Sequence, residues 1–175
     1  MRRLALALVA ALSGTLASCV APPPPPQPAP RPATPPPPPP RPAPLAADWR
    51  DWPLTPGTWA YNRDARGSRA LFGTGGADAA LVLRCDRAER RMFLSRSGAA
   101  TAPLTVRTTS ATRALAVQHT GGTPPYAAVA LAPTDPLLDA MAFSRGKLVV
   151  EQAGAPPLVV PAWAEIGRVV EDCRG

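Results

Sequence analysis

The chain has 175 residues, a formal net charge of +7 and 26 prolines. Because most of the prolines fall between Pro22 and Pro44, about 130 residues remain for a packed core, which is enough for one small domain and excludes a multidomain enzyme. From residue 48 onward, 15 basic side chains spread along the sequence stand against 12 acidic ones, so the charge does not indicate a polyanion-binding protein.

Residues 1–18 have the layout of a secretory signal peptide. Arg2 and Arg3 precede an apolar run over residues 4–12, and small residues follow it. The apolar run is too short to span a bilayer. We therefore expect residues 1–18 to be removed on export.

Residues 16–19, with the sequence LASC, resemble the lipobox of bacterial lipoproteins. The resemblance implies that Cys19 becomes the first residue of the mature protein, with diacylglycerol on its sulfur and an acyl chain on its amine, which together make a lasting membrane anchor. Val20 and Ala21 stand where Asp commonly marks inner-membrane retention, so the resemblance favours the periplasmic face of the outer membrane. The alternative is an ordinary cleaved signal, or a short apolar segment that stays in place.

The segment from Pro22 to Pro44 lacks the apolar side chains that a core needs and the N–H groups that a helix or sheet needs. We expect it to be disordered and rich in polyproline II, which at about 3.1 Å per residue could hold a domain roughly 75 Å from the membrane. A ligand for an aromatic groove is the alternative to a spacer. The predicted organisation is a signal peptide over 1–18, a lipidated Cys and linker over 19–47, and a β-rich periplasmic domain over 48–175.

Beyond residue 48, short apolar runs are separated by Gly, Pro and Asp turns, as is typical of antiparallel sheets. Alternation places Leu81, Leu83 and Cys85 on one inward face and predicts an outer row that contains Arg84, Thr105 and Arg107. The nine expected strands are 58–62, 70–72, 79–85, 91–97, 104–109, 113–118, 126–131, 147–152 and 158–160.

Two helices are expected among these strands. Asp135 followed by Pro136 predicts the start of a short helix that ends before residues 144–146. A second helix, beginning near Pro161, carries an apolar stripe that ends at Cys173. The elements predict a mainly β fold: a small antiparallel β-sandwich or partly open barrel, with the C-terminal helix closing one end.

Cys85 and Cys173 are the pair available for a disulfide if Cys19 is lipidated. Both lie on faces expected to be buried, and the periplasm is oxidising. We expect the two to be bonded, which would stabilise the fold by roughly 4 to 5 kcal/mol. Two reduced core cysteines are the alternative.

Few residues offer catalytic chemistry. His119 is the single histidine, and its surroundings have the composition of a turn. Asp135 and Asp139 lie one helical turn apart, as paired carboxylates could, yet both positions also suit the start of a helix. Residues 73–76 lack the Lys of a phosphate-binding loop, and no Cys-x-x-Cys pair occurs, so neither a cofactor nor a metal is expected.

Five arginines gather around one predicted hairpin, interrupted only by Asp86 and Glu89. Guanidinium groups suit phosphate and carboxylate oxygens, so this edge could bind lipid A phosphates, acidic headgroups or peptidoglycan carboxylates. The alternative is a solvated edge with exposed ion pairs that deters strand pairing. The candidate anion-binding residues are Arg84, Arg87, Arg90, Arg91 and Arg96.

Residues 135–146 (DPLLDAMAFSRG) and 160–174 (VPAWAEIGRVVEDCR), together with 83–86 (LRCD), resemble a family of alphaproteobacterial lipoproteins. The resemblance implies export and the fold, and brings no reaction with it. The order of elements is also loosely similar to the invasion-associated locus B family and to C-type lysozyme inhibitor lipoproteins. The Ser-Gly-x-x-Tyr loop of the inhibitors is absent here.

The expected function is therefore a non-catalytic binding or structural role in the bacterial envelope. The membrane is the expected partner through the anchor, a periplasmic protein or a peptidoglycan or lipid A component is the second, and nucleic acid is not expected. An envelope hydrolase that uses His119 or Asp135 is the alternative function. A protein similar to lysozyme inhibitors is a further alternative.

Overall fold

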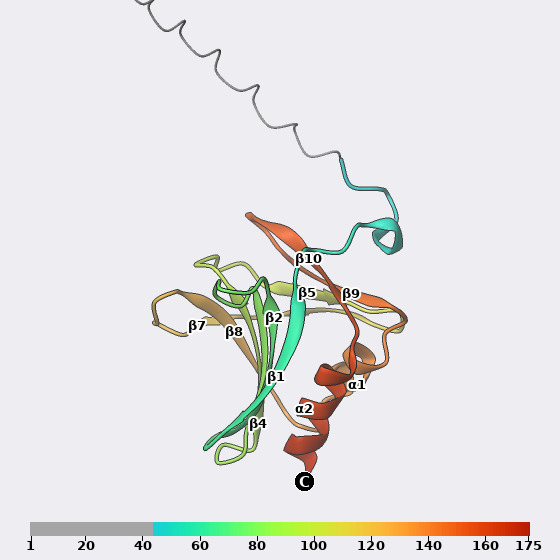
Figure 1. The fold of residues 1–175 in the computed structure, drawn as a ribbon. Helices are drawn as coiled ribbons and strands as arrows, with labels where there is room; N and C mark the ends of the chain where they lie inside the picture. Colours follow the sequence, from blue (N-terminus) through green and yellow to red (C-terminus); the bar gives the residue numbers. More distant parts are fainter. Residues whose placement is uncertain (1–43) are drawn as a thin grey trace, which may run out of the picture. The chain divides into compact units, whose positions relative to one another are not determined.

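A computed structural model describes residues 44–175, which belong to a compact unit that extends from Ala43 to Gly175. Cys19 and the predicted signal peptide lie outside the described residues, as does the linker up to residue 43. The described elements, shown in Figure 1, are η1 (Trp49–Asp51), β1 (Thr58–Asp64), β2 (Gly67–Gly73), β3 (Leu81–Asp86), β4 (Arg91–Ser97), β5 (Leu104–Arg107), β6 (Thr112–Leu115), β7 (Gln118–His119), β8 (Tyr126–Leu131), α1 (Pro136–Ala142), β9 (Lys147–Gln152), β10 (Ala155–Pro161) and α2 (Ala164–Arg174).

The strands form two antiparallel sheets. The six-stranded sheet has the order β1-β2-β3-β4-β8-β7, and the four-stranded sheet has the order β10-β9-β5-β6. Between residues 44 and 175 the strands do not close into a barrel, so the mainly β fold with two helices is confirmed in its sandwich form. Both sheets and a hydrophobic core lie within these residues, which makes this part of the chain a complete folding unit.

The alternation expected for the strands is present. Leu81, Leu83 and Cys85 on β3 are fully buried, and so are Leu104 and Val106 on β5. The residues between them are only partly buried, because successive side chains of a strand point to opposite faces of the sheet. The inward rows of the two sheets meet in one core.

The inner face of the six-stranded sheet is covered by two different partners. Trp59 on β1 donates from Nε1 to the carbonyl oxygen of Pro161 on β10 at 2.8 Å, which ties one end of β1 to the four-stranded sheet. Further along β1, the Tyr61 hydroxyl donates to Asp172 of α2 at 2.5 Å. The four-stranded sheet therefore covers one half of this face, and α2 covers the other half (Figure 1).

The two helices begin where they do for different reasons. The Asp135 carboxylate accepts from the backbone N–H of Leu137 at 2.9 Å, which confirms it as the N-cap of α1. The second helix begins at Ala164, three residues after the expected start, because Pro161 still pairs with Lys147 in the sheet. Its apolar stripe of Ile166, Val169 and Val170 is buried.

The expected strand over 113–118 is wrong at its C-terminal end. Strand β6 ends at Leu115, and the chain then leaves the four-stranded sheet. Gln118 and His119 form β7, a separate strand at the edge of the six-stranded sheet, so the described residues contain ten strands in place of nine. Local alternation could not distinguish one strand from two, because the change of sheet is a property of the packing.

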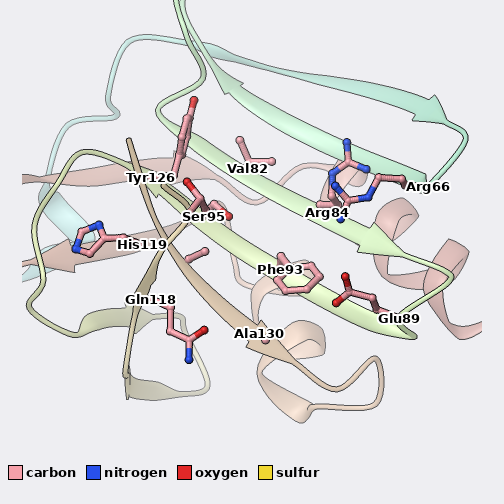
Figure 2. Close-up of a pocket in the computed structure, with 12 residues that line it drawn as sticks. Arg66, Val82, Arg84, Glu89, Phe93, Ser95, Gln118, His119, Tyr126 and Ala130 are labelled. Atoms are coloured by element: carbon pink, nitrogen blue, oxygen red, sulfur yellow. The ribbon is translucent and has the colours of Figure 1, made fainter. Parts of the chain in front are cut away.

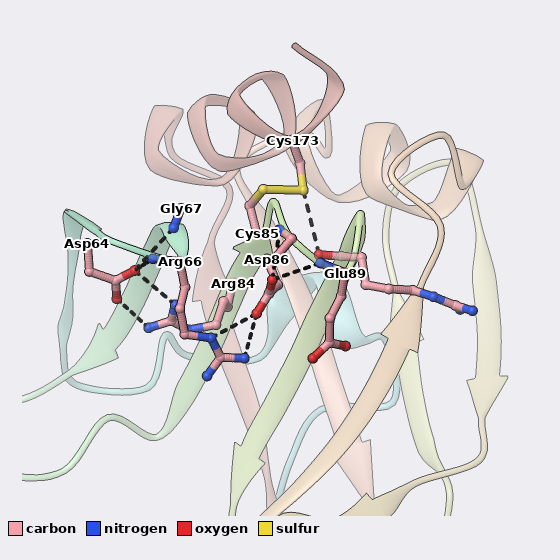
Figure 3. A network of polar contacts seen from close by, with 10 residues as sticks. Asp64, Arg66, Gly67, Arg84, Cys85, Asp86, Glu89 and Cys173 are labelled. Atoms are coloured by element: carbon pink, nitrogen blue, oxygen red, sulfur yellow. Dashed lines mark hydrogen bonds and ion pairs between the residues drawn. A yellow bond between two sulfur atoms is a disulfide. The ribbon is translucent and has the colours of Figure 1, made fainter.

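Cys85 and Cys173 are joined by a disulfide, with their Cα atoms 5.4 Å apart. The bond fixes the end of α2 to the end of β3 (Figure 3).

Gly67, at the start of β2, pairs with Asp86, the residue that follows Cys85. A side-chain carbon at Gly67 would lie 2.5 Å from the carbonyl oxygen of Cys85, so only glycine permits the close approach of these strands. Among the helices described, none has the length and apolarity that crossing a membrane requires.

Candidate functional site

The outer face of the six-stranded sheet, opposite the core, carries a groove of about 510 Å³ (Figure 2). We call it the outer groove. It crosses β3, β4 and β8, and the β1–β2 turn, the β3–β4 turn and β7 supply its walls. The lining residues are Arg66, Val82, Arg84, Glu89, Phe93, Ser95, Gln118, His119, Thr120, Tyr126, Ala128 and Ala130.

The floor of the outer groove is apolar and low. Phe93 on β4 lies opposite Ala130 on β8, and the next row places Val82, Ser95 and Ala128 side by side. Alanine at both β8 positions leaves space above the strand, since its side chain is only a methyl group. The short side chains of Ser95, Ala128 and Ala130 leave the floor low between the turns and β7, which form the walls.

Two arginines form one end of the outer groove. Arg84 on β3 pairs with Asp64 at the end of β1, with Nη2 2.6 Å from Oδ2. Arg66, in the β1–β2 turn, pairs with Asp86 at the end of β3, with Nη2 2.6 Å from Oδ2. Each hairpin therefore sends an arginine to the aspartate of the other, which holds the two guanidinium groups beside each other (Figures 2 and 3).

Both aspartates are themselves fixed by their turns. Asp64 accepts from the backbone N–H groups of Arg66 and Gly67, and Asp86 accepts from those of Ala88 and Glu89. Short polar side chains commonly make such contacts in turns. The arginines are thus oriented by carboxylates that are hydrogen-bonded to their own turns, and a ligand would meet guanidinium groups that are already in place.

These contacts change the acidity of the carboxylates. The hydrogen bond from the Arg84 side chain, with help from the Arg66 backbone N–H, lowers the pKa of Asp64 to about 2. The backbone N–H of Glu89 and the Arg66 side chain lower the pKa of Asp86 as well. Both carboxylates remain ionised at neutral pH, so the ion pairs are present under ordinary conditions.

The guanidinium groups keep donors for a ligand. Arg66 donates from Nε to Asp86 and forms the ion pair through Nη2, and no described residue accepts from its Nη1. Arg84 gives Nη1 and Nη2 to Asp64 and leaves Nε without an acceptor in the described part of the chain. A phosphate or carboxylate at this end of the groove could therefore receive charge-assisted hydrogen bonds from groups already aligned.

The other end of the outer groove is lined by polar side chains and, among the described residues, by no Arg, Lys, Asp or Glu. The Tyr126 hydroxyl donates to the carbonyl oxygen of Ala79 at 2.7 Å. This hydrogen bond holds the ring over the sheet, where it forms a wall of the groove. Ser95 lies on the floor beside it, and Gln118 and His119 of β7 line the edge of the groove here (Figure 2). A nucleophile and its base would be joined by a hydrogen bond. Within residues 44–175, the His119 ring forms no such bond with Ser95.

The structure places the two alternative candidates for a hydrolase residue in different parts of the domain. His119 lies in the outer groove, on a strand where a loop was expected. Asp135 lies elsewhere, caps α1 and binds Arg113 through both oxygens at 2.9 and 2.8 Å. The Arg113 side chain lowers the pKa of Asp135, so this carboxyl is not suited to act as an acid near neutral pH. Asp139, the second carboxylate of the expected pair, forms an ion pair with Arg174, whose Nη1 lies 2.8 Å from Oδ1.

The expected arginine cluster is divided by the fold. Arg84 lines the outer groove, whereas Arg87 and Arg90 in the β3–β4 turn and Arg91 at the start of β4 are exposed outside it. Arg96 is 4% exposed and points into the core, so its inclusion among the surface anion-binding residues is wrong. The period of two along β4 decides this, because Arg96 shares a face with the buried Met92 and Leu94.

Sequence reasoning missed Arg66. It lies 18 residues before Arg84 in the chain, in a different hairpin, and reaches the groove because β2 pairs with β3. The aromatic members Phe93 and Tyr126 were also missed. Phe93 could have been found from the alternation along β4, which leaves this large ring on the outward face.

No metal centre is evident in the part of the chain that the structure describes, since no three His, Cys, Asp or Glu side chains gather there. No protein-family model, no curated protein sequence and no solved structure matches this chain.

Proposed function

We propose that this protein is a lipid-anchored lipoprotein of the bacterial envelope that binds an anionic envelope component in its outer groove, without catalysing a reaction on it. One observation carries the proposal: the same groove has an apolar floor and two aligned guanidinium groups, those of Arg66 and Arg84. A ligand that fits both has an apolar or sugar-ring body and an acidic group at one end.

Two envelope molecules have that chemistry. Peptidoglycan stem peptides carry carboxylates next to sugar rings, and lipid A carries phosphates on glucosamine. Phe93 and Tyr126 offer ring faces for a sugar or an apolar chain, and Ser95 and Gln118 offer hydrogen bonds. The acidic group would lie at Arg66 and Arg84.

The anchor is supported by the sequence alone, since Cys19 lies outside the described residues. The Cys85–Cys173 disulfide agrees with an oxidising compartment. Mass spectrometry of the natively expressed protein tests the anchor: an N-terminal peptide that begins at Cys19 and carries diacylglycerol and acyl mass is expected. An unmodified sulfur in that peptide would contradict the anchor and leave the groove proposal standing.

The groove is tested with the domain 44–175 and two soluble probes, a muropeptide with free carboxylates and glucosamine 1-phosphate. Isothermal titration calorimetry should detect binding of at least one of them. Arg84→Gln should weaken that binding about tenfold or more, because a charged hydrogen-bonding group is lost. Phe93→Ala should weaken it as well if the ring contacts the body of the ligand.

A matched control exists on the other sheet. Arg107 on β5 also points outward and also pairs with a carboxylate, that of Glu151. Arg107→Gln should leave the affinity unchanged. Equal losses from Arg84→Gln and Arg107→Gln would indicate attraction by net charge, and failure to bind either probe would show that the ligand class is wrong.

A further inference from the structure

A second exposed surface lies on another part of the domain and combines aromatic rings with cations. It is a depression of about 560 Å³ beside η1 and the loop that follows α1. Its lining includes two aromatic and three basic side chains and no acidic one. We call it the aromatic-basic surface, and the side chains that define it are Trp49, Arg50, Phe143, Arg145 and Lys147.

Phe143 is the most unusual member. Its side chain is 80% exposed, more than that of any other large apolar residue described as exposed. The backbone N–H of Phe143 donates to the carbonyl oxygen of Asp139 and ends α1, so the helix needs the backbone of this residue and not its ring. The fold therefore gives no reason for an aromatic ring here, whereas a binding surface does.

The loop that presents Phe143 is held in place on both sides. Ser144 is buried, accepts from the N–H of Thr109 at 3.1 Å and donates to the carbonyl oxygen of Lys147 at 2.6 Å. The N–H of Arg145 donates to the Thr109 hydroxyl at 3.2 Å. The ring of Phe143 and the side chain of Arg145 are thus displayed next to each other from a fixed loop.

The cations of the surface are distributed around the rings. The Arg50 guanidinium lies 5.0 Å from the centre of the Trp49 ring, and the Lys147 ammonium donates to the carbonyl oxygen of Trp52 at 2.7 Å. Asp48 lies 3.4 Å from Arg50 in an exposed pair, which offsets part of one charge. Asp51 also lies on η1, outside the lining. Arg145 has no carboxylate partner among the described residues, and the lining itself carries three basic side chains and no acidic one.

We propose that the aromatic-basic surface docks on the anionic phospholipid headgroups of a membrane, with Phe143 and Trp49 in the interface and the basic side chains at the phosphates. Aromatic rings favour the boundary between headgroups and acyl chains, and each Lys or Arg near an anionic surface contributes about 1 kcal/mol. The surface meets both requirements at once.

The position of the incoming chain supports a membrane as the occupant. The described chain begins at Pro44, five residues before Trp49, and Trp52 donates from Nε1 to the carbonyl oxygen of Ala46 at 2.6 Å. A tether to the membrane would therefore enter the domain beside this surface. Tethering raises the effective concentration of the domain at the membrane, so a weak intrinsic affinity is sufficient. This step rests on the membrane anchor of the proposed function, whereas the inference does not depend on a ligand in the outer groove.

Sedimentation with lipid vesicles tests the proposal with the unanchored domain 44–175, a complete folding unit. Vesicles of phosphatidylethanolamine with one third phosphatidylglycerol should carry the domain down at low salt, and phosphatidylcholine vesicles should carry much less. Phe143→Ser should weaken the apparent affinity roughly tenfold. Arg145→Gln should weaken it about fivefold, as the loss of one cation at the surface predicts.

Arg87→Gln is the matched control, because Arg87 is an exposed arginine of a turn outside this surface. It should change the affinity less than twofold, and circular dichroism should show all three variants folded. The proposal is overturned if the domain ignores anionic vesicles or if Arg87→Gln weakens binding as much as Arg145→Gln. It is also overturned if Phe143→Ser abolishes self-association of the domain without any vesicle binding, which would assign the surface to a second copy.

Discussion

Arg96 on β4 donates from Nη1 to the carbonyl oxygen of Val150 on β9 at 2.8 Å, so a guanidinium group from one sheet hydrogen-bonds to the backbone of the other inside the sandwich. Its Nη2 donates to the carbonyl oxygen of Pro156 on β10. Burial lowers the pKa of Arg96, and no carboxylate pairs with it among the described residues. The two sheets are joined here by a buried cation and backbone dipoles.

Replacing this arginine should destabilise the domain. Arg96→Ala leaves a cavity and removes the hydrogen bonds that Arg96 donates to two carbonyl oxygens, and we expect a loss of about 2 to 4 kcal/mol in the free energy of unfolding. Arg91→Ala, at an exposed position of the same strand, should change it by less than about 0.5 kcal/mol. Urea unfolding of both variants measures the difference, and equal values would show that Arg96 does not join the sheets.

The disulfide should account for a large share of the stability. Cys85 and Cys173 are 88 residues apart in the chain, and closing such a loop is worth about 4 to 5 kcal/mol on the chain-entropy model. The double variant Cys85→Ala, Cys173→Ala should lose stability by about that amount. Dithiothreitol should destabilise the wild type and leave the double variant unchanged. Two free thiols in the unreduced wild type would instead support the alternative of reduced core cysteines.

The stability should fall in acid because of the carboxylates beside the outer groove. Arg84 and the Arg66 N–H lower the pKa of Asp64 to about 2, whereas an unfolded Asp titrates near ~3.9. This contribution is therefore complete above about pH 4 and is lost as the pH falls toward 2, because the unfolded chain takes up the proton first. Urea unfolding between pH 2 and 6 should show a steeper decline for the wild type than for Asp64→Asn.

The asparagine at position 64 keeps an oxygen for the turn and removes the charge, so the comparison isolates the ion pair with Arg84. Asp78→Asn is the control, since Asp78 is exposed in a turn and takes part in no ion pair within residues 44–175. Its pH dependence should match that of the wild type. A parallel decline in all three proteins would contradict the assignment to Asp64.

Asp135 and His119 should respond differently from catalytic residues. Asp135→Ala removes the N-cap of α1 and the pair with Arg113, at a cost of about 1 to 2 kcal/mol, whereas Asp135→Asn keeps the cap and costs less. His119→Ala should change stability by less than about 0.5 kcal/mol. Muropeptide profiles of cells that carry these variants should equal the wild-type profile. A changed profile with a stable variant would favour the envelope hydrolase, and inhibition in a lysozyme turbidity assay would favour the inhibitor alternative.

Several features could be predicted because they depend on local periodicity. The inward row of Leu81, Leu83 and Cys85 and the buried stripe of α2 each repeat with the period of their own element. The N-cap at Asp135 depends on residues next to it in the chain. The disulfide followed from two such rows, since each placed a cysteine on a buried face. These signals depend on residues close together in the chain, so they do not change with the arrangement of the elements.

The outer groove could not be predicted in the same way. Arg66 and Arg84 meet because one hairpin pairs beside the other, and each arginine finds its aspartate across that pairing. His119 reaches the groove because the chain changes sheets after Leu115. Arginines expected in one cluster lie apart in the structure, since Arg96 is buried between the sheets and Arg84 lines the groove.

From the sequence alone came the mainly β class of the domain, the cysteine pair and the start of the first helix, because hydrophobic alternation and capping act over a few residues. The tertiary structure decided which arginines share a groove, which one is buried between the sheets, and where Phe143 and Trp49 meet the cations around them. Strand order and the packing of the sheets set these contacts, and they are made by residues far apart in the chain.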